Sequence, residues 1–565
     1  MNLSDLHIEV RMAKSAPIVA GLCADLQIAS IIDRFVEWDP HRTKVSPGIR
    51  IVALIVNFLV QRKPLYKIER FYANMDCEWL FGQGFLADEL NDDRLAAALD
   101  KLADADPWRI YHEIALGTPE AQFDTFDRLL HFDTTSISVQ GSYEDSELED
   151  SPLKIVRGYS KDLRADLKQF MYGLGSIGGI PLFADVMNGN TSDKPWYSDL
   201  TGRIDRLLSP EAWNSIVVVA DSAFVTEENL QTYEKRSFIS RLPDTYNLCK
   251  QLKDRAFQQE EQFVDLGVLG SARKNSATYR IQSFKEELYE RAYRFVVVQT
   301  SHLDERKAKR LMKQIADEAE QLTKEIEKQQ AIEFHCEPDA TVALTQFLHD
   351  HKAKFHQING HVQSEKVVKR RRGRPSKNNT YGQLVEKDIW RICIQFNQDD
   401  ETIARTKQRE GTFVLISNVD KSNKSDEKLV TDYKSQIQVE NLFRAVKHPF
   451  LMYGIFLKNP KRVQAMAYVF LFALLVYAIL QQRIRRGLDT ESQPLILNGV
   501  KILSPTGWTI LEEFENVTHI IVRLPDGQTH HRLDGITEGA IRILRWLQLQ
   551  RKSLLTAAGL QEPTG

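Results

Sequence analysis

The chain has 565 residues, of which 42% are hydrophobic and 27% charged, and its formal net charge is −3 at pH 7. This length exceeds what one hydrophobic core supports and predicts about three or four modules. The composition is that of a folded globular protein and excludes a disordered or disulfide-built chain. Because the net charge is close to zero, any contact with nucleic acid must come from local basic patches. The five cysteines are scattered and form no Cys-x-x-Cys pair, which favours a reducing cytoplasm and argues against a structural zinc site.

The first 122 residues are predicted to form a helical domain. Apolar residues recur at helical spacing between Ile49 and Leu59, and a second helix is predicted at Asp93–Leu99. Basic residues cluster in and around these helices, which suits a DNA-binding module, although scattered surface charge produces the same pattern. The basic residues are His41, Arg42, Lys44, Arg50, Arg62, Lys63, Lys67 and Arg70.

Two apolar stretches raise the question of a membrane. Ala16–Ala24 follows the acidic Glu9 and continues with helical periodicity to Phe35, which favours an amphipathic helix over a signal peptide. Ala465–Leu480 is continuously apolar with basic residues at both ends, but its 16 residues fall short of the roughly 20 that span a bilayer. We therefore expect a buried core helix, with an integral membrane protein as the alternative.

Between residues 123 and 242 the pattern changes to the strands of an α/β core. The predicted strands are Leu129–Val139, Gln169–Gly175, Ile180–Val186, Ile216–Ala220 and Phe238–Leu242. The fourth is a β-branched run that ends on Asp221, and a helix is predicted after the N-cap residue Thr226. Three strands followed by a strand, a helix and a strand form a sheet that needs a further helix to cover it.

Residues 243–425 have a mixed helical and strand character. Strand-like segments at Ala277–Phe284 and Tyr293–Thr300 precede a charged helix predicted from Leu303 to Lys328. The basic loop 366–377 contains Arg-Gly-Arg-Pro at 372–375, which matches the core of an AT-hook. In such a motif the arginines enter the narrow minor groove of A·T-rich DNA. A solvated basic linker is the alternative for this loop.

Two acidic residues stand where strands would bring them together. Asp133 lies within the first predicted strand, and Asp221 directly follows the fourth. If these strands are parallel neighbours, both carboxylates lie at one edge of the sheet. Carboxylates are ligands that Mg²⁺ prefers, and a metal pair about 3.5–4 Å apart can activate water and clamp an in-line phosphoryl transfer. Aspartate is also common at strand ends as a turn former, so the two residues alone do not establish a site.

A polar stripe around residue 440 strengthens the metal-site hypothesis. Tyr433, Gln436, Glu440, Arg444 and Lys447 follow one another at steps of 3, 4, 4 and 3, which places them on one face of a predicted helix. A carboxylate flanked by cations can ligate metal while the cations meet DNA phosphates. The apolar residues predicted to pack on the rest of the helix are Ile437, Val439, Leu442, Phe443 and Val446.

Tyr433, Gln436, Glu440 and Lys447 also match a signature at every spacing, Tyr-x2-Arg-x3-Glu-x6-Lys, with glutamine at the arginine position. In this the chain resembles the DDE transposases of the insertion-sequence-four supergroup, most closely the branch in which that arginine is commonly glutamine. Roughly residues 30–485 share the resemblance. The other matching stretches are Phe132–Thr135, Tyr159–Asp162, Arg164–Gln169, Gly189–Asp193 and Val219–Ala223.

The resemblance implies an α/β fold with an RNase H-like catalytic core, an inserted α+β domain and an N-terminal helical domain. The expected segments are 1–122, helical and DNA-binding; 123–242, the first part of the core; 243–425, the insertion domain with basic loop 366–377; 426–490, the second part of the core with the catalytic helix; and 491–565, a C-terminal segment of unknown role.

The resemblance also implies a reaction and a metal site. Asp133, Asp221 and Glu440 are expected to be catalytic and to hold Mg²⁺ or Mn²⁺, as two ions. Hydrolysis at the terminal phosphates of an insertion sequence would be followed by attack of the freed 3′ hydroxyls on target DNA, without a covalent protein intermediate.

The expected partner is double-stranded DNA, both as terminal inverted repeats and as target, with a homodimer as the active complex. By resemblance, Tyr433 and Lys447 would position the transposon end. The polar stripe adds Gln436 and Arg444 as expected DNA contacts. The basic loop adds two more expected contacts, Arg372 and Arg374. The protein is expected to be located in the cytoplasm, associated with the nucleoid and not with a membrane.

Two other functions share parts of this pattern. A domesticated or inactive relative would bind DNA without cutting it, which the intact carboxylate trio argues against. An RNase H-like nuclease or junction resolvase would share the carboxylates but needs neither the long insertion nor the stripe from Tyr433 to Lys447. Terminal inverted repeats in the flanking DNA would favour the transposase.

Overall fold

The computed structural model describes residues 7–121, 128–162, 164–270, 276–303, 305–370, 384–447, 457–491 and 493–549. The chain divides into two compact units. The first comprises residues 1–241, 417–424 and 428–565, and the second comprises residues 242–416 and 425–427.

The N-terminal part of the first unit is a cluster of helices. Its helices are α1 (Ala16–Asp25), α2 (Ile28–Phe35), α3 (Pro47–Val60), α4 (Ile68–Tyr72), α5 (Cys77–Phe81), α6 (Asp92–Asp104) and α7 (Pro107–Leu116). The predicted helices near residues 50 and 95 are confirmed as α3 and α6. The single helix predicted from residue 16 to 35 is wrong, because Gln27 adopts a left-handed conformation with a φ of 53° and separates α1 from α2.

The core sheet of the first unit has the strand order β4-β3-β2-β5-β6. Its strands are β2 (Leu129–Val139), β3 (Lys168–Ile177), β4 (Ile180–Met187), β5 (Val217–Ala220) and β6 (Ser237–Arg241). Strand β3 is antiparallel to β2 and β4, whereas β2, β5 and β6 run parallel. The five predicted strands and the predicted parallel neighbours are confirmed.

Three helices lie between β4 and β6 in the chain: α8 (Asp193–Ile204), α9 (Pro210–Asn214) and α10 (Glu227–Thr232). Thr226 is the N-cap of α10, as predicted, and its side chain accepts a hydrogen bond from the backbone N–H of Asn229. Helix α8 packs against α10 and against Ser222–Phe224, the turn that follows Asp221.

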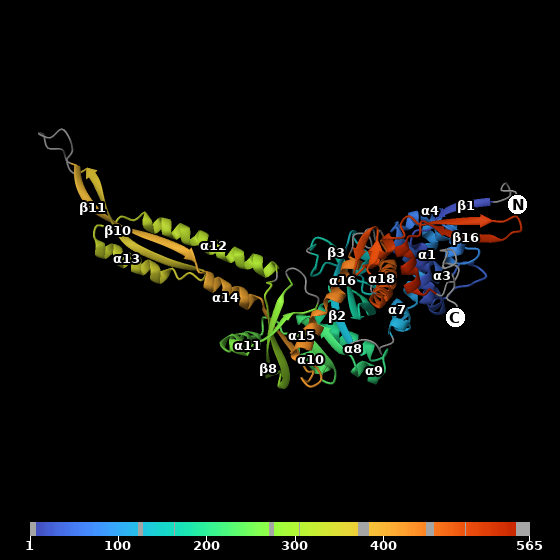
Figure 1. Cartoon of the computed structure of the whole chain (residues 1–565), viewed down its shortest axis with the longest axis horizontal. Helices are drawn as coiled ribbons and strands as arrows, with labels where there is room; N and C mark the ends of the chain where they lie inside the picture. The colour runs from blue at the N-terminus through green and yellow to red at the C-terminus, as the bar shows by residue number, and fades with distance from the viewer. Residues whose placement is uncertain are drawn as a thin grey trace. The chain divides into compact units, whose positions relative to one another are not determined.

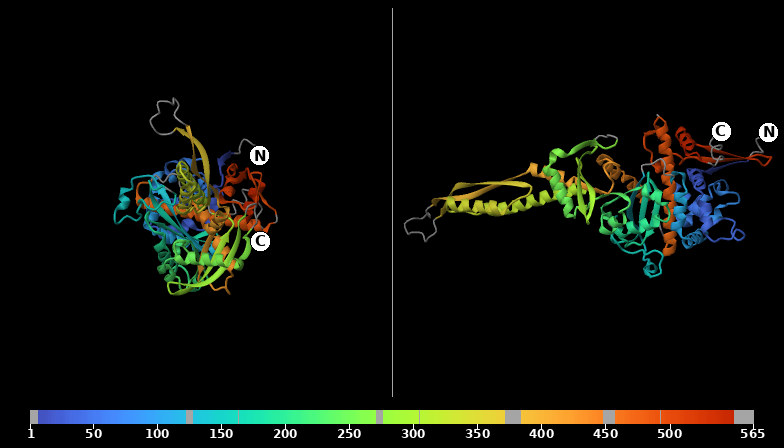
Figure 2. Two further views of the ribbon diagram at one scale, coloured as in Figure 1. Left: turned by 90° about the vertical axis from the view of Figure 1, so that its left-hand side faces the viewer. Right: turned by 90° about the horizontal axis from the view of Figure 1, so that it is seen from below.

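A 31-residue helix, α18 (Pro460–Thr490), packs between the core sheet and the N-terminal helices of the first unit (Figure 2). Every residue from Ala465 to Leu480 is buried. The Tyr172 hydroxyl of β3 donates a 2.8 Å hydrogen bond to the Ala467 carbonyl oxygen. The helix is long and apolar enough to cross a membrane, but its most apolar window is 94% buried inside the protein. The predicted core helix is therefore confirmed, although it extends beyond the apolar run at both ends.

The C-terminal part of the first unit joins the two ends of the chain. It contains β13 (Leu495–Leu497), β14 (Val500–Ile502), α19 (Gly507–Glu512), β15 (Thr518–Arg523), β16 (Thr529–Asp534) and α20 (Glu538–Leu547). Strand β1 (His7–Met12) pairs antiparallel with β15, which gives a sheet of order β1-β15-β16. The helical prediction for the N-terminus is wrong at β1, because a six-residue strand is stabilised there by a partner about 500 residues away.

The second unit combines a sheet with a long hairpin (Figure 1). Its elements are α11 (Asn247–Gln258), β7 (Val264–Val268), β8 (Thr278–Leu288), β9 (Arg291–Thr300), α12 (Glu305–Gln330), α13 (Glu337–Asp350), β10 (His356–Arg370), β11 (Leu384–Gln398), α14 (Asp400–Glu410) and β12 (Thr412–Ser417). The sheet order is β12-β9-β8-β7. Helices α12 and α13 pack on the β10–β11 hairpin through a cluster that includes Leu322, Phe347 and Ile394. Residues 371–383, between the hairpin strands, lie outside the described residues and include Arg372 and Arg374.

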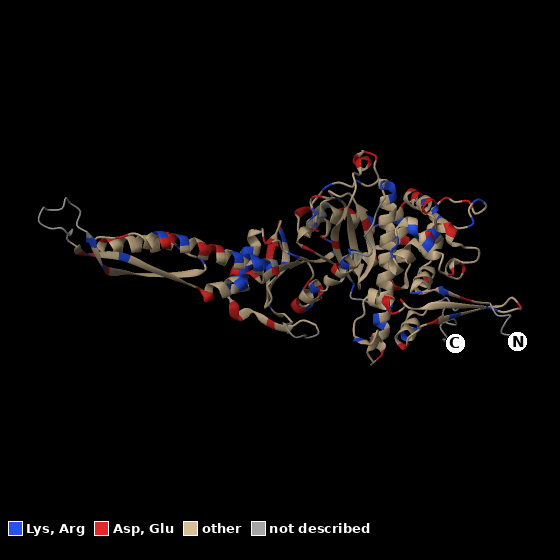
Figure 3. Ribbon diagram, turned by 90° about the horizontal axis from the view of Figure 1, so that it is seen from above, with Lys and Arg blue, Asp and Glu red and all other residues tan. Residues whose placement is uncertain are grey.

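Basic and acidic residues alternate along the ribbon of both units (Figure 3). This distribution agrees with the near-zero net charge of the chain. Contact with DNA phosphates therefore depends on where individual cations lie relative to the site.

Candidate active site at the edge of the core sheet

The parallel pairing of β2 and β5 places Asp133 beside Asp221. The paired residues are in continuous register, and the last pair is His131 with Val219. Asp133 and Asp221 each come two residues after this pair. Because side chains alternate along a strand, both carboxylates lie on the same side of the sheet as His131 and Val219. Both side chains are partly buried. The edge of the sheet therefore carries two carboxylates from strands that are far apart in sequence.

A lysine lies next to Asp133. The Lys161 ammonium donates 2.8 Å hydrogen bonds to the backbone oxygen and the hydroxyl of Thr134, and its Nζ lies 3.8 Å from the Asp133 Oδ1 atom. The same carboxylate oxygen accepts a 2.8 Å hydrogen bond from the Thr134 backbone N–H. These contacts orient Asp133 and give the carboxylate a nearby positive charge.

Asp221 is oriented by three contacts. Its Oδ1 atom accepts 3.0 Å hydrogen bonds from the Tyr197 hydroxyl of α8 and from the backbone N–H of Ala223. Its backbone oxygen accepts a 2.7 Å hydrogen bond from the Ser240 hydroxyl of β6. Since both side-chain hydrogen bonds use the same oxygen, Oδ2 is the atom turned to other ligands.

The segment that carries Glu440 consists of two helices, α15 (Asp426–Lys434) and α16 (Ile437–Val446). The prediction of one helical face from Tyr433 to Lys447 is wrong, because a tight turn at residues 435 and 436 separates α15 from α16. In this turn the N–H groups of Gln436 and Gln438 bond to carbonyls three residues earlier, in the manner of a 3₁₀ helix. Ile437 is also 55% exposed, contrary to its predicted apolar packing.

Burial raises the pKa of Tyr433 in α15 to about 12. Of the charges around the phenol, Arg241 lowers this pKa, while Asp221, Glu440 and Asp133 raise it. All three predicted carboxylates therefore lie close enough to act on one tyrosine, although they come from β2, the end of β5 and α16. The structure brings together four of the sequence-predicted residues, and the phenol stays protonated at neutral pH.

The side chain of His131 in β2 connects the turn between α15 and α16 to the sheet. Its Nε2 atom lies 3.0 Å from the hydroxyl oxygen of Ser435, and that hydroxyl donates to the Asp432 carbonyl oxygen at 2.6 Å. The Ser435 hydroxyl has one proton and donates it to Asp432, so Nε2 of His131 is the donor to the Ser435 oxygen. Burial lowers the pKa of His131 to about 4, which keeps the ring neutral. Helix α16, which carries Glu440, also packs on β2 and β3.

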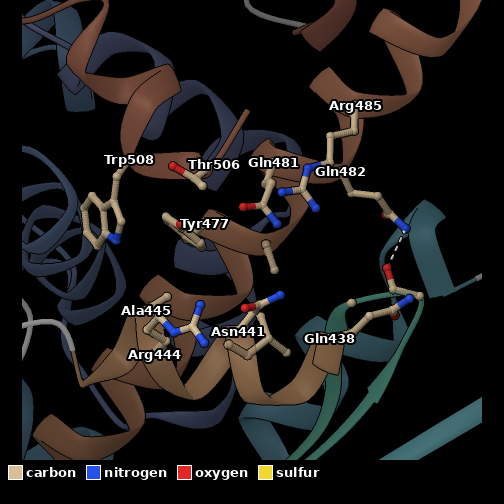
Figure 4. Close-up of a pocket in the computed structure, with 14 residues that line it drawn as sticks. Gln438, Asn441, Arg444, Ala445, Tyr477, Gln481, Gln482, Arg485, Thr506 and Trp508 are labelled. Carbon is tan, nitrogen blue, oxygen red and sulfur yellow. Dashed lines mark hydrogen bonds between the residues drawn. The ribbon is translucent and has the colours of Figure 1, made fainter. Parts of the chain in front are cut away.

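The predicted DNA-contacting residues are more dispersed. Arg444 of α16 lines a cavity of about 320 Å³, together with the amides of Asn441 and Gln481 (Figure 4). Lys447 follows α16 and its ammonium pairs with the Asp162 carboxylate at 2.5 Å. Gln436 is half-buried in the turn between the two helices.

Two cations at this edge were not singled out from the sequence. Arg241 ends β6, which pairs in parallel with β5 up to Ala220 and Ser240, so Arg241 is the residue level with Asp221. Arg241 had one indication in the sequence. It is a basic residue at the end of a predicted strand, and the predicted strand before it ends on Asp221. Lys161 falls within a matched stretch, but nothing in that stretch connects its ammonium with Asp133.

Comparisons with known proteins show which family the chain resembles. Residues 125–476 match the model of the transposase DDE domain. Residues 8–116 match a domain of unknown function, DUF4277. No curated protein matches the chain.

Among solved structures, one match is the cryo-EM structure of a piggyBac transposase synaptic complex with hairpin DNA. It is 8% identical in sequence with a TM-score of 0.32, and the match covers 99% of this chain and 89% of that one. This similarity is too low to carry an argument, so the assignment rests on the family model.

The matched domain extends over well over half of the 565 residues and contains the three carboxylates, Tyr433 and the core sheet. The fold agrees with the RNase H-like core and the inserted α+β unit that the family resemblance implied. The chain therefore belongs to the DDE-domain transposases, which cleave and join DNA strands by metal-dependent phosphoryl transfer.

Proposed function

We propose that Asp133, Asp221 and Glu440 hold the divalent metal of this transposase, as a pair of Mg²⁺ or Mn²⁺ ions. The donor set fits such ions, because three carboxylates that act on one tyrosine supply the hard oxygen ligands they prefer. A bound pair would activate water and neutralise charge on the scissile phosphate. The parallel register that puts Asp133 beside Asp221, with the Glu440 helix α16 packed on β2, is the observation that carries this proposal.

The residues around the carboxylates have separate parts in the reaction. Tyr197 and Ala223 hold Asp221 in one orientation, so its free oxygen keeps a fixed direction. Tyr433 is a neutral donor that can hydrogen-bond a phosphate oxygen, because its pKa of about 12 keeps the proton on the phenol. Arg241 supplies positive charge on the same side, where a DNA phosphate would otherwise meet three negative groups.

The reaction is proposed to be cut-and-paste transposition. Strand cleavage at each insertion-sequence end frees a 3′ hydroxyl, and this hydroxyl then attacks a phosphate of the target DNA. To test this, purified protein is incubated with DNA carrying its own element's terminal repeat and Mg²⁺ or Mn²⁺. Nicked ends and joined products are expected.

Alanine at Asp133 or Glu440 should abolish both products while end binding in a gel-shift assay stays nearly unchanged. The matched control is Glu427→Ala, a change of another acidic residue on the segment that leads to α16. Cleavage that persists in either variant would remove that residue from the proposed metal site.

We also propose contacts with DNA outside the carboxylate site. Lys447 would exchange its Asp162 partner for a backbone phosphate, and Arg444 would meet DNA at the cavity of Figure 4. Arg372 and Arg374 would enter the minor groove. Replacing these two loop arginines with alanine should weaken DNA affinity and reduce the slope of log affinity against log salt by about 0.9 per lost phosphate contact. An unchanged slope would leave the loop as a linker.

The active complex is proposed to be a homodimer, since an insertion sequence has two ends to be cut and joined. Light scattering of the protein alone and with end DNA measures this directly. The protein is proposed to act in the cytoplasm at the nucleoid, in line with scattered cysteines that remain unpaired in the structure. A membrane fraction that held the protein without detergent would contradict this location.

A further inference from the structure

Two imidazoles come together on one face of the sheet that joins the chain ends. In the antiparallel pair of β15 and β16, His519 lies opposite Leu533 and Ile521 lies opposite His531. His519 and His531 are therefore diagonal neighbours on the same face. The His519 Nε2 atom lies 2.9 Å from the His531 Nδ1 atom.

A carboxylate from the N-terminal helices completes this group. Asp76 is the N-cap of α5, and its Oδ1 atom accepts a 3.0 Å hydrogen bond from the backbone N–H of Trp79. Its Oδ2 atom lies 3.9 Å from the His519 Nδ1 atom. One ligand atom from each of Asp76, His519 and His531 lies within 4.8 Å of the other two. The three residues meet only because β1 and β15 bring the two ends of the chain together.

The Trp79 indole holds both rings in place. It stacks on His519 with ring centroids 4.2 Å apart and lies nearly parallel to His531 at 5.9 Å. His519 is 1% exposed, and burial followed by the neighbouring His531 lowers its pKa to about 4. The His519 ring is therefore neutral at physiological pH, which is the form that ligates metals.

One side of the group is open. A cavity of about 690 Å³ is lined by Asp76, His531, Trp79 and Thr529 among others, so water or a further ligand can reach the group. Arg11 lines the same cavity, but its guanidinium is bonded to the Glu9 carboxylate at 2.6 Å. Arg523 also lines the cavity, 3.7 Å from the same Glu9 carboxylate, so Glu9 offsets part of the positive charge near Asp76.

We propose that Asp76, His519 and His531 form a second metal site, for a divalent transition-metal ion of the Zn²⁺ class, which fastens the C-terminal hairpin to the N-terminal helices. Two imidazoles and one carboxylate are the donors this class favours, whereas Mg²⁺ takes oxygen ligands. Two nitrogens that each lie about 2.1 Å from one tetrahedral ion are about 3.4 Å apart, so the two imidazole nitrogens, now 2.9 Å apart, need to separate by only about 0.5 Å. A water from the cavity side would fill the fourth position. The scattered cysteines had argued against structural zinc, and this site uses none of them.

The test measures Zn²⁺ bound to the full chain, purified without a histidine tag. Excess Mg²⁺ is present to occupy the carboxylate site at the sheet edge, and the Asp221→Asn variant is used so that the two sites are distinguishable. After dialysis against limiting Zn²⁺, elemental analysis should find about one Zn²⁺ per chain. Co²⁺ in place of Zn²⁺ should give the visible absorption of a site with nitrogen ligands.

His531→Ala should remove the bound Zn²⁺ and the Co²⁺ spectrum. His530→Ala is the matched control, because His530 is the exposed neighbour on the same strand and should keep both. Stoichiometric Zn²⁺ in His531→Ala, or none in the otherwise unchanged chain, would overturn the proposal.

A second variant covers the case in which His531→Ala fails to fold. Asp76→Asn retains the oxygen that caps α5, since asparagine is as good an N-cap as aspartate, but it removes the charge. It should weaken Zn²⁺ affinity by about 10-fold or more while leaving the melting temperature in chelator unchanged. Equal Zn²⁺ affinity in Asp76→Asn and the parent chain would mean that the three residues form a hydrogen-bonded cluster only.

Discussion

The two proposed metal sites in the first unit differ in environment and in composition. At the sheet edge, Asp133, Asp221 and Glu440 are partly or fully exposed, bear like charges and have lysine and arginine beside them. In the terminal sheet, His519 is buried beneath an indole and its ring is neutral.

This difference in exposure and charge indicates which kind of metal ion each group of side chains can bind. An open edge of carboxylates has the like-charge repulsion that hard cations relieve, and it leaves room for a DNA strand. A pair of imidazoles, one of them buried beneath the Trp79 indole, lacks this crowding of carboxylates and suits a borderline ion with a fixed geometry. The sheet edge is therefore suited to chemistry, and the terminal sheet to a permanent connection between the chain ends.

The sharpest test of the comparison is Asp221→Asn. Asparagine keeps an oxygen for the hydrogen bonds from Tyr197 and Ala223 but removes one of the like charges. DNA cleavage should fall by about 10³-fold or more, since losing several kcal/mol of transition-state stabilisation costs a factor of ten per about 1.4 kcal/mol. The melting temperature without metal should rise, because carboxylate repulsion is reduced. A lower melting temperature would mean that the carboxylates do not repel one another.

Removal of the cation beside the carboxylates should have a smaller effect. Arg241→Ala should lower the rate of DNA cleavage by about 10- to 100-fold, the loss expected for one charge-assisted hydrogen bond to a phosphate. Arg241→Lys retains the charge and should recover part of the rate. Single-turnover cleavage rates at saturating protein measure both variants, and equal rates for alanine and arginine would exclude a role for this side chain.

His112 is a third histidine whose ring is kept neutral by burial, and it lies outside both proposed metal sites. The Nδ1–H group of His112 donates to the Trp108 carbonyl oxygen at 2.7 Å, and Nε2 accepts from the Ala184 N–H at 3.4 Å, so both nitrogens are engaged within the protein. Burial lowers the pKa of His112 to about 4, below its unfolded value of about 6.5.

A depressed histidine pKa means that the unfolded chain binds the proton more readily. The stability from His112 is thus fully present above pH 6.5 or so, and it declines by up to about 1.4 kcal/mol per pH unit as the pH falls towards 4. Urea unfolding at pH 7 and pH 5 should show a smaller loss of stability in His112→Gln than in the parent chain. Added Zn²⁺ should leave this difference unchanged. Equal losses would show that His112 is not the group that titrates.

Most of the core, and the four residues proposed for the site, could be predicted from the sequence. The strands β2 and β5 could be recognised because apolar and β-branched residues predominate in them. Asp221 directly follows β5, whose pattern is the stronger of the two. The helical spacing from Tyr433 to Glu440 identified the third carboxylate, even though α15 and α16 are separate helices. The break at residues 435 and 436 could not be predicted, because it is fixed by the hydrogen bond between Ser435 and His131 of β2, a contact across about 300 residues.

The amino-acid sequence by itself determined which acidic residues to group, because Asp133 and Asp221 belong to predicted strands and Glu440 to a polar stripe at helical spacing; metal-dependent phosphoryl transfer followed from the family resemblance. Only the tertiary structure decided which cations stand beside those carboxylates, because strand register alone brings Arg241 level with Asp221. It also decided that Asp76 meets His519 and His531. Local patterns report neighbours within a few residues, whereas the pairing of β1 with β15 joins segments from opposite ends of the chain.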